Sequence, residues 1–293
     1  GFDLPKTTEF VSEKLKSYGI NPTPCGKGIT AMIGKGNPVI LLRADMDALP
    51  IEEKTGLPFK SEIKGQMHAC GHDAHTAMLL GAVRWLKRHE AQLQGCVKAV
   101  FQPAEEMLEG AADMIEAGVL HEPEVKGAMM IHVMCGVAVA TGTRVVSGAG
   151  VSAPAADFYT VEIKGAGCHA SMPHLGKDPL TTAAHLLVAL DGIKAREIDY
   201  AKKAVLTIGA LEGAVSANVI PDRVVLRGSM RAFDEEVRGY MKKRLREMVV
   251  GMGTVFSTPA EVTFTGGAPT LCNDAELSKK CYEILCQSKT GKV

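Results

Sequence analysis

The chain has 293 residues, of which 46% are hydrophobic and 5% aromatic, and its 33 Lys and Arg residues balance its 33 Asp and Glu residues. This balance argues against a basic field that holds nucleic acid or an anionic membrane, so we expect neither partner. No apolar run reaches the roughly 18 residues of a membrane-spanning helix. The composition therefore predicts a soluble globular protein with one large or two ordinary domains.

The first half of the chain alternates predicted strands and helices. Residues 28–45 contain two short apolar strands around a Gly-Asn-Pro turn, and Asp45 and Asp47 stand at the end of the second. A helix is predicted through Met78 and Leu86, where apolar residues recur at helical spacing. Further elements are strands over 96–101 and 127–133 and a helix over 111–117. This alternation predicts an α/β layer with its chemistry at the carboxyl ends of the strands.

The pattern changes at about residue 148. Predicted strands around 159–163, 205–211, 224–233 and 261–265 are interrupted by two helices, one through Leu180 and one that begins at Asp234. The order β-α-β-β-α-β is typical of the split βαβ arrangement of a small sandwich. One more helix is predicted to begin near Asp274.

Eight cysteines are scattered along the chain, without a CxxC pair or a dense framework, at positions 25, 70, 96, 135, 168, 272, 281 and 286. A chain of this length does not need disulfides for its stability. We therefore predict a reducing, cytoplasmic environment, with disulfides as the minor alternative.

The segment HACGHDAHTAM, residues 68–78, places Cys70 and His72 one residue apart, before the predicted helix. A thiolate and an imidazole at this spacing can meet at one borderline metal ion. The alternatives are a buried apolar Cys70 and an incidental cluster, with His75 as a surface or capped histidine.

Two adjacent carboxylates follow a predicted buried strand in FQPAEE, at Glu105 and Glu106. One can bind a metal ion while the other takes the proton of a water molecule, which is the division of labour that hydrolysis needs. The alternative is a solvated pair in a loop. His132 falls at the end of another predicted strand, where a satisfied core histidine is the more common explanation for a lone histidine.

Polar residues of the second half form a further candidate set. GCHASMPH supplies His169 and His174, NVIPD supplies Asn218, and Arg231 shares a strand face with Arg227. Such residues can polarise a carbonyl and bind a carboxylate, because Arg matches carboxylate geometry. Each also has a structural explanation as a turn residue or as part of a polar sheet face.

Six segments occur in the order RADMDALPI, HACGHDAHTAMLLGA, FQPAEE, GCHASMPH, DPL and NVIPD. In these six segments and their order, the chain resembles metal-dependent amidohydrolases of the hippurate hydrolase and auxin-conjugate hydrolase type. These enzymes are a branch of the aminoacylase and carboxypeptidase-like metallopeptidases. The resemblance implies an α/β catalytic domain with a central mixed sheet of the phosphorylase/hydrolase-like kind, formed by residues 1–147 and 263–293. It also implies an inserted α+β, ferredoxin-like lid domain, residues 148–262, that makes the contact of a homodimer.

The resemblance further implies two divalent metal ions, with manganese or zinc expected. Cys70 would bridge them, His72 and Glu106 would be terminal ligands, and His132 would fill a further position. Asp47 would orient a histidine ligand.

The implied reaction is hydrolysis of the amide bond of N-acyl amino acids by a metal-activated water. Glu105 would be the general base and acid, and His169 is similar to a lid histidine that reaches the active site of the partner subunit and stabilises the oxyanion. Asn218, His174 and Arg231 would bind the substrate, with Arg231 near its carboxylate.

Two departures from the family pattern support another hypothesis. No histidine follows His185, although the family has a last histidine ligand near its C-terminus, and we predict no opening helix at the start. The alternative is therefore a truncated, non-catalytic remnant that dimerises through its lid domain. A single structural zinc or redox module is a third possibility, but it leaves Glu105 and Glu106 unexplained.

Overall fold

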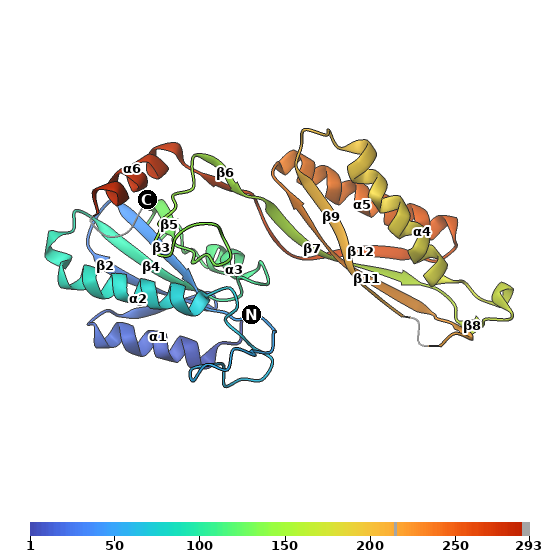
Figure 1. Ribbon diagram of the computed structural model, residues 1–293, viewed down its shortest axis with the longest axis horizontal. Coiled ribbons are helices and arrows are strands. Elements are labelled where there is room, and N and C mark those ends of the chain that lie inside the picture. Colours follow the sequence, from blue (N-terminus) through green and yellow to red (C-terminus); the bar gives the residue numbers. More distant parts are fainter. Residues whose placement is uncertain (214–215, 289–293) are drawn as a thin grey trace. The chain divides into compact units, whose positions relative to one another are not determined.

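The computed structural model describes residues 1–213 and 216–288, and the chain divides into two compact units, residues 1–141 and 142–293 (Figure 1). Within the described ranges, no helix is long and apolar enough to cross a membrane. Over the same ranges, which include all eight cysteines, no disulfide is formed.

A five-stranded mixed sheet forms the centre of the first unit. Its strands, in spatial order, are β1 (Pro22–Cys25), β2 (Gly28–Gly34), β4 (Cys96–Gln102), β3 (Val39–Asp45) and β5 (Val125–Met130). Strand β3 runs parallel to both β4 and β5, whereas β2 is antiparallel to β1 and β4. The expected mixed sheet is therefore confirmed. The two strands predicted around the Gly-Asn-Pro turn do not pair with each other, because β4 lies between them.

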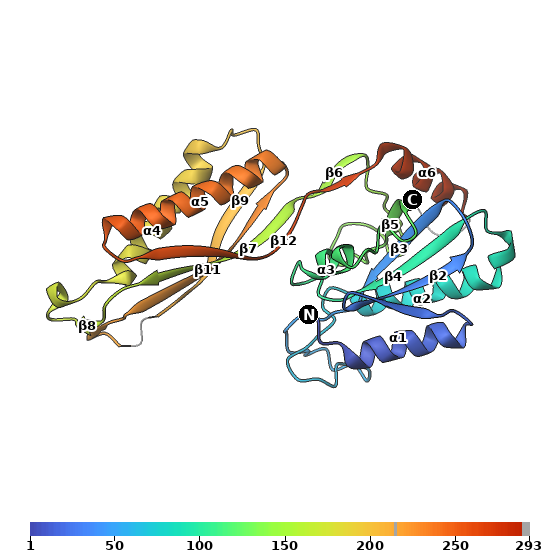
Figure 2. The same ribbon diagram turned by 180° about the vertical axis from the view of Figure 1, so that it is seen from behind.

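Helices α1 (Pro5–Ser17) and α2 (His72–Arg88) pack on one face of this sheet, as Figures 1 and 2 show. The shorter α3 (Gly110–Glu116) packs on the other face, where Met114 meets Leu41 and Val100. The main core joins both long helices to β2 and β4 through Val11, Leu15, Leu79, Val83, Ile29, Ile33 and Phe101.

The prediction that the chain lacks an opening helix is wrong, because α1 occupies residues 5–17. Pro5 supplies the fixed φ of a first helical position, and Val11 and Leu15, one turn apart, are fully buried. The apolar stripe is short, and the N-cap, Leu4, makes no side-chain capping bond. The usual start signal of a helix is therefore missing.

The second unit has the predicted order of elements. Its sheet and helices are β7 (Ala155–Lys164), α4 (Pro179–Gly192), β9 (Ala204–Glu212), β11 (Arg223–Ala232), α5 (Glu235–Val255) and β12 (Ala260–Ala268). The four strands form an antiparallel sheet in the order β12-β7-β11-β9. This is the arrangement expected of a split βαβ fold. Residues 263–268, which we assigned to the catalytic domain, pair with β7 in this sheet. The proposed lid role and the remaining boundaries stay predictions.

Short elements complete the second unit. They are β6 (Gly150–Ala153) paired with β13 (Leu271–Asn273), β8 (Cys168–His169) paired with β10 (Val219–Ile220), η2 (Pro173–Leu175), η3 (Ile193–Glu197) and α6 (Ala275–Gln287). In the first unit, η1 (Glu90–Gln92) follows α2. The α6 helix begins one residue after Asp274, whose side chain accepts a hydrogen bond from the backbone N–H of Leu277, as a helix N-cap does.

A buried carboxylate fixes α5 to the second sheet. Asp157, on β7, is 1% exposed and accepts two hydrogen bonds from the Arg238 guanidinium, at 2.7 and 2.8 Å, and one ion pair from Lys242 at 2.7 Å. Burial alone would raise the pKa of Asp157, but the two cations lower it below its usual value. The carboxylate is therefore charged and paired in the folded unit.

We predict that Asp157→Asn lowers the free energy of unfolding by roughly 3 kcal/mol, because two cations lose a buried partner. Since the pKa of Asp157 is lowered, this stabilisation is present above about pH 3.9 and is lost as the pH falls through the folded-state value. Urea unfolding followed by circular dichroism measures the change. Glu247→Gln, which removes a partly exposed ion pair of the same helix, is the control, and equal stability of the two variants would contradict the prediction.

Candidate metal centre

The candidate side chains come together at one edge of the first sheet. Strands β3, β4 and β5 are parallel, so their carboxyl ends lie side by side, with Asp45 opposite Gln102 and Arg43 opposite Met130 in the strand register. Asp47, Glu105 and Glu106, and His132 follow the ends of these three strands. Cys70, His72 and His75 reach the same edge from the start of α2.

Two backbone positions aim these side chains. Gly71 has a φ of +87°, and a Cβ there would lie 2.4 Å from Cγ2 of Val133, so only glycine fits the turn between Cys70 and His72. Ala104, directly before the two glutamates, is fully buried with a φ of +49°. A non-glycine residue in this region is strained, and such strain is typical of functional sites.

Asp47 binds both the histidine and the glutamate segment. Its Oδ1 lies 3.2 Å from Nδ1 of His72 and 3.1 Å from the backbone N–H of Glu105, which donates to it. Its Oδ2 accepts the backbone N–H of Glu106 at 3.2 Å. The contact with a histidine that the sequence predicts for Asp47 is therefore present, and it turns Nε2 of His72 toward the glutamates.

The expected ligand atoms form two overlapping groups. Cys70, His72 and His132 offer donor atoms within 4.8 Å of one another, and so do His72, Glu105 and Glu106. Sγ of Cys70 lies 3.4 Å from Nε2 of His132, and Nε2 of His72 lies 3.7 Å from Oε1 of Glu106. His72 belongs to both groups and so links the group that contains the thiol to the group that contains the carboxylates.

The donor atoms fit divalent cations. Nε2 of His72 and Oε1 of Glu106 are buried and have no hydrogen-bond partner among the described residues. An unpartnered buried polar atom costs about 1–3 kcal/mol, and a cation between these two atoms removes that cost. Thiolate, imidazole and carboxylate together form a ligand set for borderline divalent ions such as zinc, with manganese also compatible.

The charge of the site leads to the same conclusion. Burial raises the pKa of the Cys70 thiol to about 11, and the nearby Glu106, Glu105 and Asp45 add to the shift. Burial alone would lower the pKa of His72, but Asp47, Asp45 and Glu105 raise it above its usual value. The carboxylates thus disfavour a further negative charge and favour positive charge at this point.

Sequence reasoning missed two residues of the site. His75, interpreted as a surface or capped histidine, is only 2% exposed, and its Nδ1 lies 2.6 Å from Oδ1 of Asp45. Asp45, which is 1% exposed, also accepts a hydrogen bond from Arg43 at 2.9 Å. The available signals were the position of Asp45 at a strand end and the spacing of His75, three residues after His72 on the helix.

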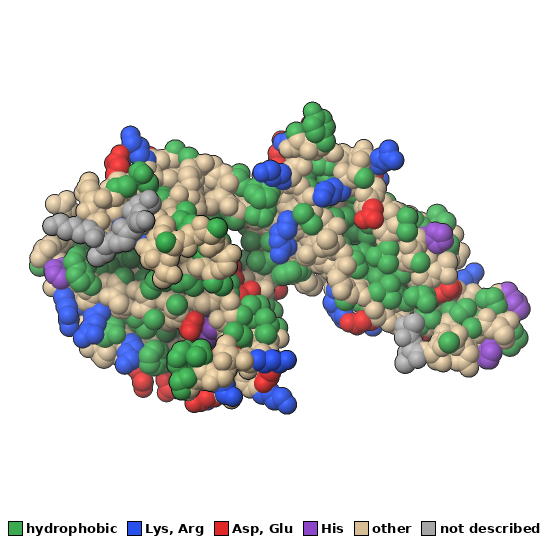
Figure 3. Space-filling view, viewed as in Figure 1, with side chains coloured by type: hydrophobic (Ala, Val, Ile, Leu, Met, Phe, Trp, Pro, Cys, Tyr) green, Lys and Arg blue, Asp and Glu red, His purple; other side chains and the backbone are tan. Residues whose placement is uncertain are grey.

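In the second unit, the structure brings His169 and Asn218 together. Strand β8 pairs with β10 so that His169 stands opposite Val219, and the backbone N–H of Ala170 donates to the carbonyl of Asn218 at 3.0 Å. His174 lies in η2 and is exposed. Figure 3 shows histidine side chains on the surface at the end of this unit that carries β8.

Arg231 lies away from that group. Its strand, β11, begins at Arg223 near β10, and eight residues of strand separate the two arginines by about 26 Å. The Arg231 guanidinium lies 5.6 Å from the centre of the Phe158 ring and donates to the carbonyl of Met230. Within this unit, His169 and Asn218 can act on the same group, but Arg231 cannot act together with them.

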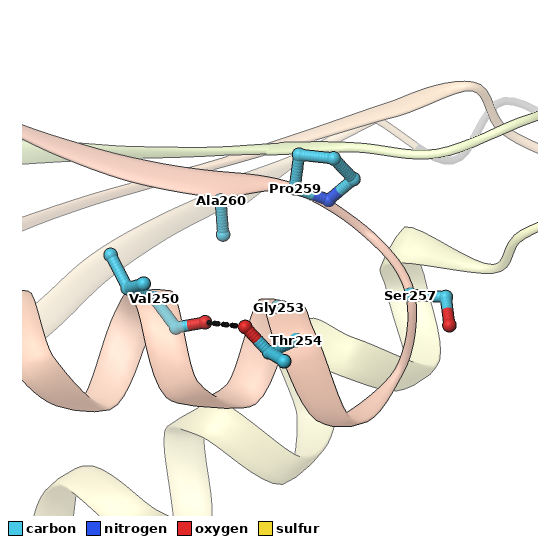
Figure 4. A pocket seen from close by; sticks show the side chains of 6 residues that line it. All are labelled: Val250, Gly253, Thr254, Ser257, Pro259 and Ala260. Atoms are coloured by element: carbon cyan, nitrogen blue, oxygen red, sulfur yellow. Dashed lines mark hydrogen bonds between the residues drawn. The ribbon is translucent and has the colours of Figure 1, made fainter.

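A hollow of about 390 Å³ lies elsewhere in the second unit, between the end of α5 and the start of β12 (Figure 4). Its lining is Val250, Gly253, Thr254, Ser257, Pro259 and Ala260. These residues contain no ionisable side chain, and the Thr254 hydroxyl donates to the carbonyl of Val250. The hollow therefore does not contribute to the chemistry described above.

Residues 41–292 match the model of peptidase family M20/M25/M40. The chain belongs to this family. The family resemblance predicted from six short segments is therefore confirmed, and the residues of the metal centre all lie within the matched range.

Several known proteins are similar to most of this chain. It is 44% identical over 278 residues to N-acetyl-L-cysteine deacetylase of Bacillus subtilis, with 93% of this chain and 65% of that protein covered. Hippurate hydrolase of Campylobacter jejuni is 36% identical, with coverages of 97% and 74%. A dinuclear metal-binding M20 peptidase of B. subtilis has a similar structure, with a TM-score of 0.74, 31% identity, and coverages of 98% and 75%. The chain thus spans less than two thirds of the length of the deacetylase.

We predict that zinc binding to this M20 chain releases about one proton from Cys70 at pH 7, because a thiol with a pKa of about 11 is protonated there and must ionise to bind. Metal affinity should therefore rise with pH throughout the range below that value. Calorimetric titration in two buffers of different ionisation enthalpy measures the protons released. Cys70→Ser should release about one proton fewer, and equal release from both proteins would contradict the prediction.

Proposed function

We propose that this M20 chain hydrolyses the amide bond of N-acyl amino acids, with two divalent ions held by Cys70, His72, Glu106 and His132. The observation that carries the proposal is a pair of buried atoms beside the Cys70 thiol, Nε2 of His72 and Oε1 of Glu106, which have no hydrogen-bond partner in the described part of the chain. The substrate class is supported by two relatives, whose names refer to N-acetyl-L-cysteine and to hippurate, an N-acylated glycine.

Bound divalent ions would supply the Lewis acidity that polarises the amide carbonyl and makes water more acidic. Cys70 would contribute a negative charge shared between the ions, while His72, Glu106 and His132 would complete their ligand shells. Asp47 keeps His72 in the orientation that presents Nε2, because it holds Nδ1 of the same ring.

Glu105 is the proposed general base and acid. Its side chain is 34% exposed, compared with 21% for Glu106, so it is the more accessible of the two carboxylates to water and substrate. Burial raises the pKa of Glu105, and Glu106 and Asp45 raise it further, while Arg43 opposes the shift. A carboxylate with a raised pKa takes a proton from water more readily, and it can return the proton to the leaving nitrogen.

We propose for the second unit the roles of lid and dimer contact. Among the described residues, β9 and β12 have a strand partner on one side only, and exposed sheet edges of this kind are usually covered. His169 as oxyanion stabiliser, and Asn218, His174 and Arg231 as substrate-binding residues, belong to the same proposal. The adjacency of His169 and Asn218 supports a shared role for these two.

Glu105→Gln should lower kcat for amine release from N-acetyl-L-cysteine or hippurate by about 10²- to 10⁴-fold, because the proton acceptor is lost. The number of metal ions bound should stay the same, as determined by atomic emission on the purified protein. Glu106→Gln is the matched control, in which the metal content falls as well. Activity that survives Glu105→Gln would contradict the proposal. A wild-type protein that is itself inactive would favour the alternative of a non-catalytic, dimerising protein.

The proposed dimer contact predicts a mass of twice that of the 31.1 kDa chain in light scattering at micromolar concentration. Placing a charge on the edge strand, with Val205→Lys on β9, should shift the equilibrium toward the monomer, because Val205 is 44% exposed and a lysine there opposes pairing. Val188→Lys, on the exposed face of α4, is the control. A wild-type protein that remains monomeric would exclude this contact.

A further inference from the structure

Asp45 and His75 form a buried pair beside the proposed ligands. Nδ1 of His75 lies 2.6 Å from Oδ1 of Asp45, and Nε2 of His75 accepts the backbone N–H of Val133 at 2.9 Å. The N–H of Val133 can only donate, so Nε2 is the acceptor and Nδ1 carries the proton that is donated to Asp45. Both ring nitrogens are therefore used within the protein.

Because both of its ring nitrogens are hydrogen-bonded, His75 differs from the proposed metal ligands. Asp45, His72 and His75 also lie close enough together to hold an ion, with donor atoms within 4.8 Å. Binding there would require His75 to give up one of its two hydrogen bonds. In contrast, Nε2 of His72 has no partner among the described residues. The geometry thus favours His72 as a ligand and gives His75 a different role.

The segment that His75 holds carries His132. Strand β5 ends at Met130, and residues 131–134 are exposed and have no regular secondary structure. Two contacts from the start of α2 fix this segment. His75 binds the backbone of Val133, and Gly71 leaves the space that the Val133 side chain fills.

The ring of His132 is oriented by the same contacts. It packs against the His75 ring with 4.4 Å between centroids, and its Nδ1 lies 2.6 Å from the carbonyl of Val133. A carbonyl oxygen can only accept, so Nδ1 carries the hydrogen and donates a hydrogen bond to it. The lone pair of Nε2 is then directed to the Cys70 thiol at 3.4 Å.

We infer that His75 is a positioning residue, which holds the Val133 backbone so that His132 reaches the ion shared with Cys70. The inference rests on the proposed function, because it takes His132 to be a ligand. Arg43 extends the network through Asp45, so the position of His132 depends on the end of β3 as well as on α2. Residues that orient metal ligands in this way typically change metal affinity about 10- to 100-fold when they are replaced.

The experiment is a cobalt titration of the full chain and of three variants. His75→Phe keeps the ring volume but removes both hydrogen bonds, and it should weaken cobalt binding about 10- to 100-fold and diminish the thiolate-to-cobalt charge-transfer absorption of Cys70. His75→Gln keeps one donor and one acceptor and should recover part of both signals. His185→Phe, in the second unit, is the matched control and should bind cobalt as the wild type does.

A double-mutant cycle with His132→Ala separates positioning from general stabilisation. If His75 acts through His132, the double variant should bind cobalt no more weakly than His132→Ala alone. A folded His75→Phe variant with wild-type affinity and absorption would overturn the inference, as would additive losses. If His132→Ala itself has no effect, the proposed ligand set fails, so the two failures are distinguishable.

A measurement on the wild-type protein tests the hydrogen bond between His75 and the Val133 backbone, even if His75→Phe does not fold. The amide of Val133 belongs to a residue that is 37% exposed, but its N–H is bound to His75. Hydrogen exchange followed by NMR should therefore show this amide protected relative to that of Met134, a residue that is 69% exposed. Equal, fast exchange at both positions would overturn the inference.

Discussion

The carboxylate of Asp47 joins three of the chain segments that form the metal centre. It follows β3, holds Nδ1 of His72 at the start of α2, and accepts the backbone N–H groups of Glu105 and Glu106 after β4. Without this carboxylate, two partly buried backbone donors and a buried imidazole would lose their partner together. A buried polar group without a partner costs about 1–3 kcal/mol. The same contacts orient Nε2 of His72 and the backbone that carries the two glutamates. The Asp47 carboxylate therefore both stabilises the fold and positions the proposed ligands.

The sheet supplies the second condition for the site. Because β3, β4 and β5 are parallel, their carboxyl ends place carboxylates and a histidine along one edge, and the turn at Gly71 adds the thiol. This arrangement brings several negatively charged groups close together, and burial makes their charge unfavourable. The raised pKa values of Cys70 and Glu105 reflect this cost. The proposed pair of cations would offset this charge. The strained backbone at Ala104 is consistent with a site whose geometry serves a function more than stability.

The second unit has its own hydrophobic core, with Tyr159, Val161, Leu226 and Met241 among the buried residues, and its own buried ion cluster around Asp157. Contacts within the unit therefore hold its strands and helices together. The candidate residues there are divided between two ends of one strand, since His169 and Asn218 lie near the start of β11 and Arg231 lies near its end. A small molecule can therefore contact only one of these two groups in any one copy of the unit.

The sequence by itself determined the features that depend on neighbouring residues. Helical and alternating periodicity predicted the β-α-β-β-α-β order of the second unit, and the residue types at strand ends predicted that Cys70, His72, Glu106 and His132 converge. Only the tertiary structure decided that His75 is buried, because its partners, Asp45 and Val133, are 30 and 58 residues away in the chain. It also decided that β4 lies between β2 and β3, and that the short apolar stripe of α1 suffices for a helix once it packs on the sheet. Local patterns specify elements and candidate chemistry, whereas pairing and burial depend on contacts between distant residues, which periodicity does not encode.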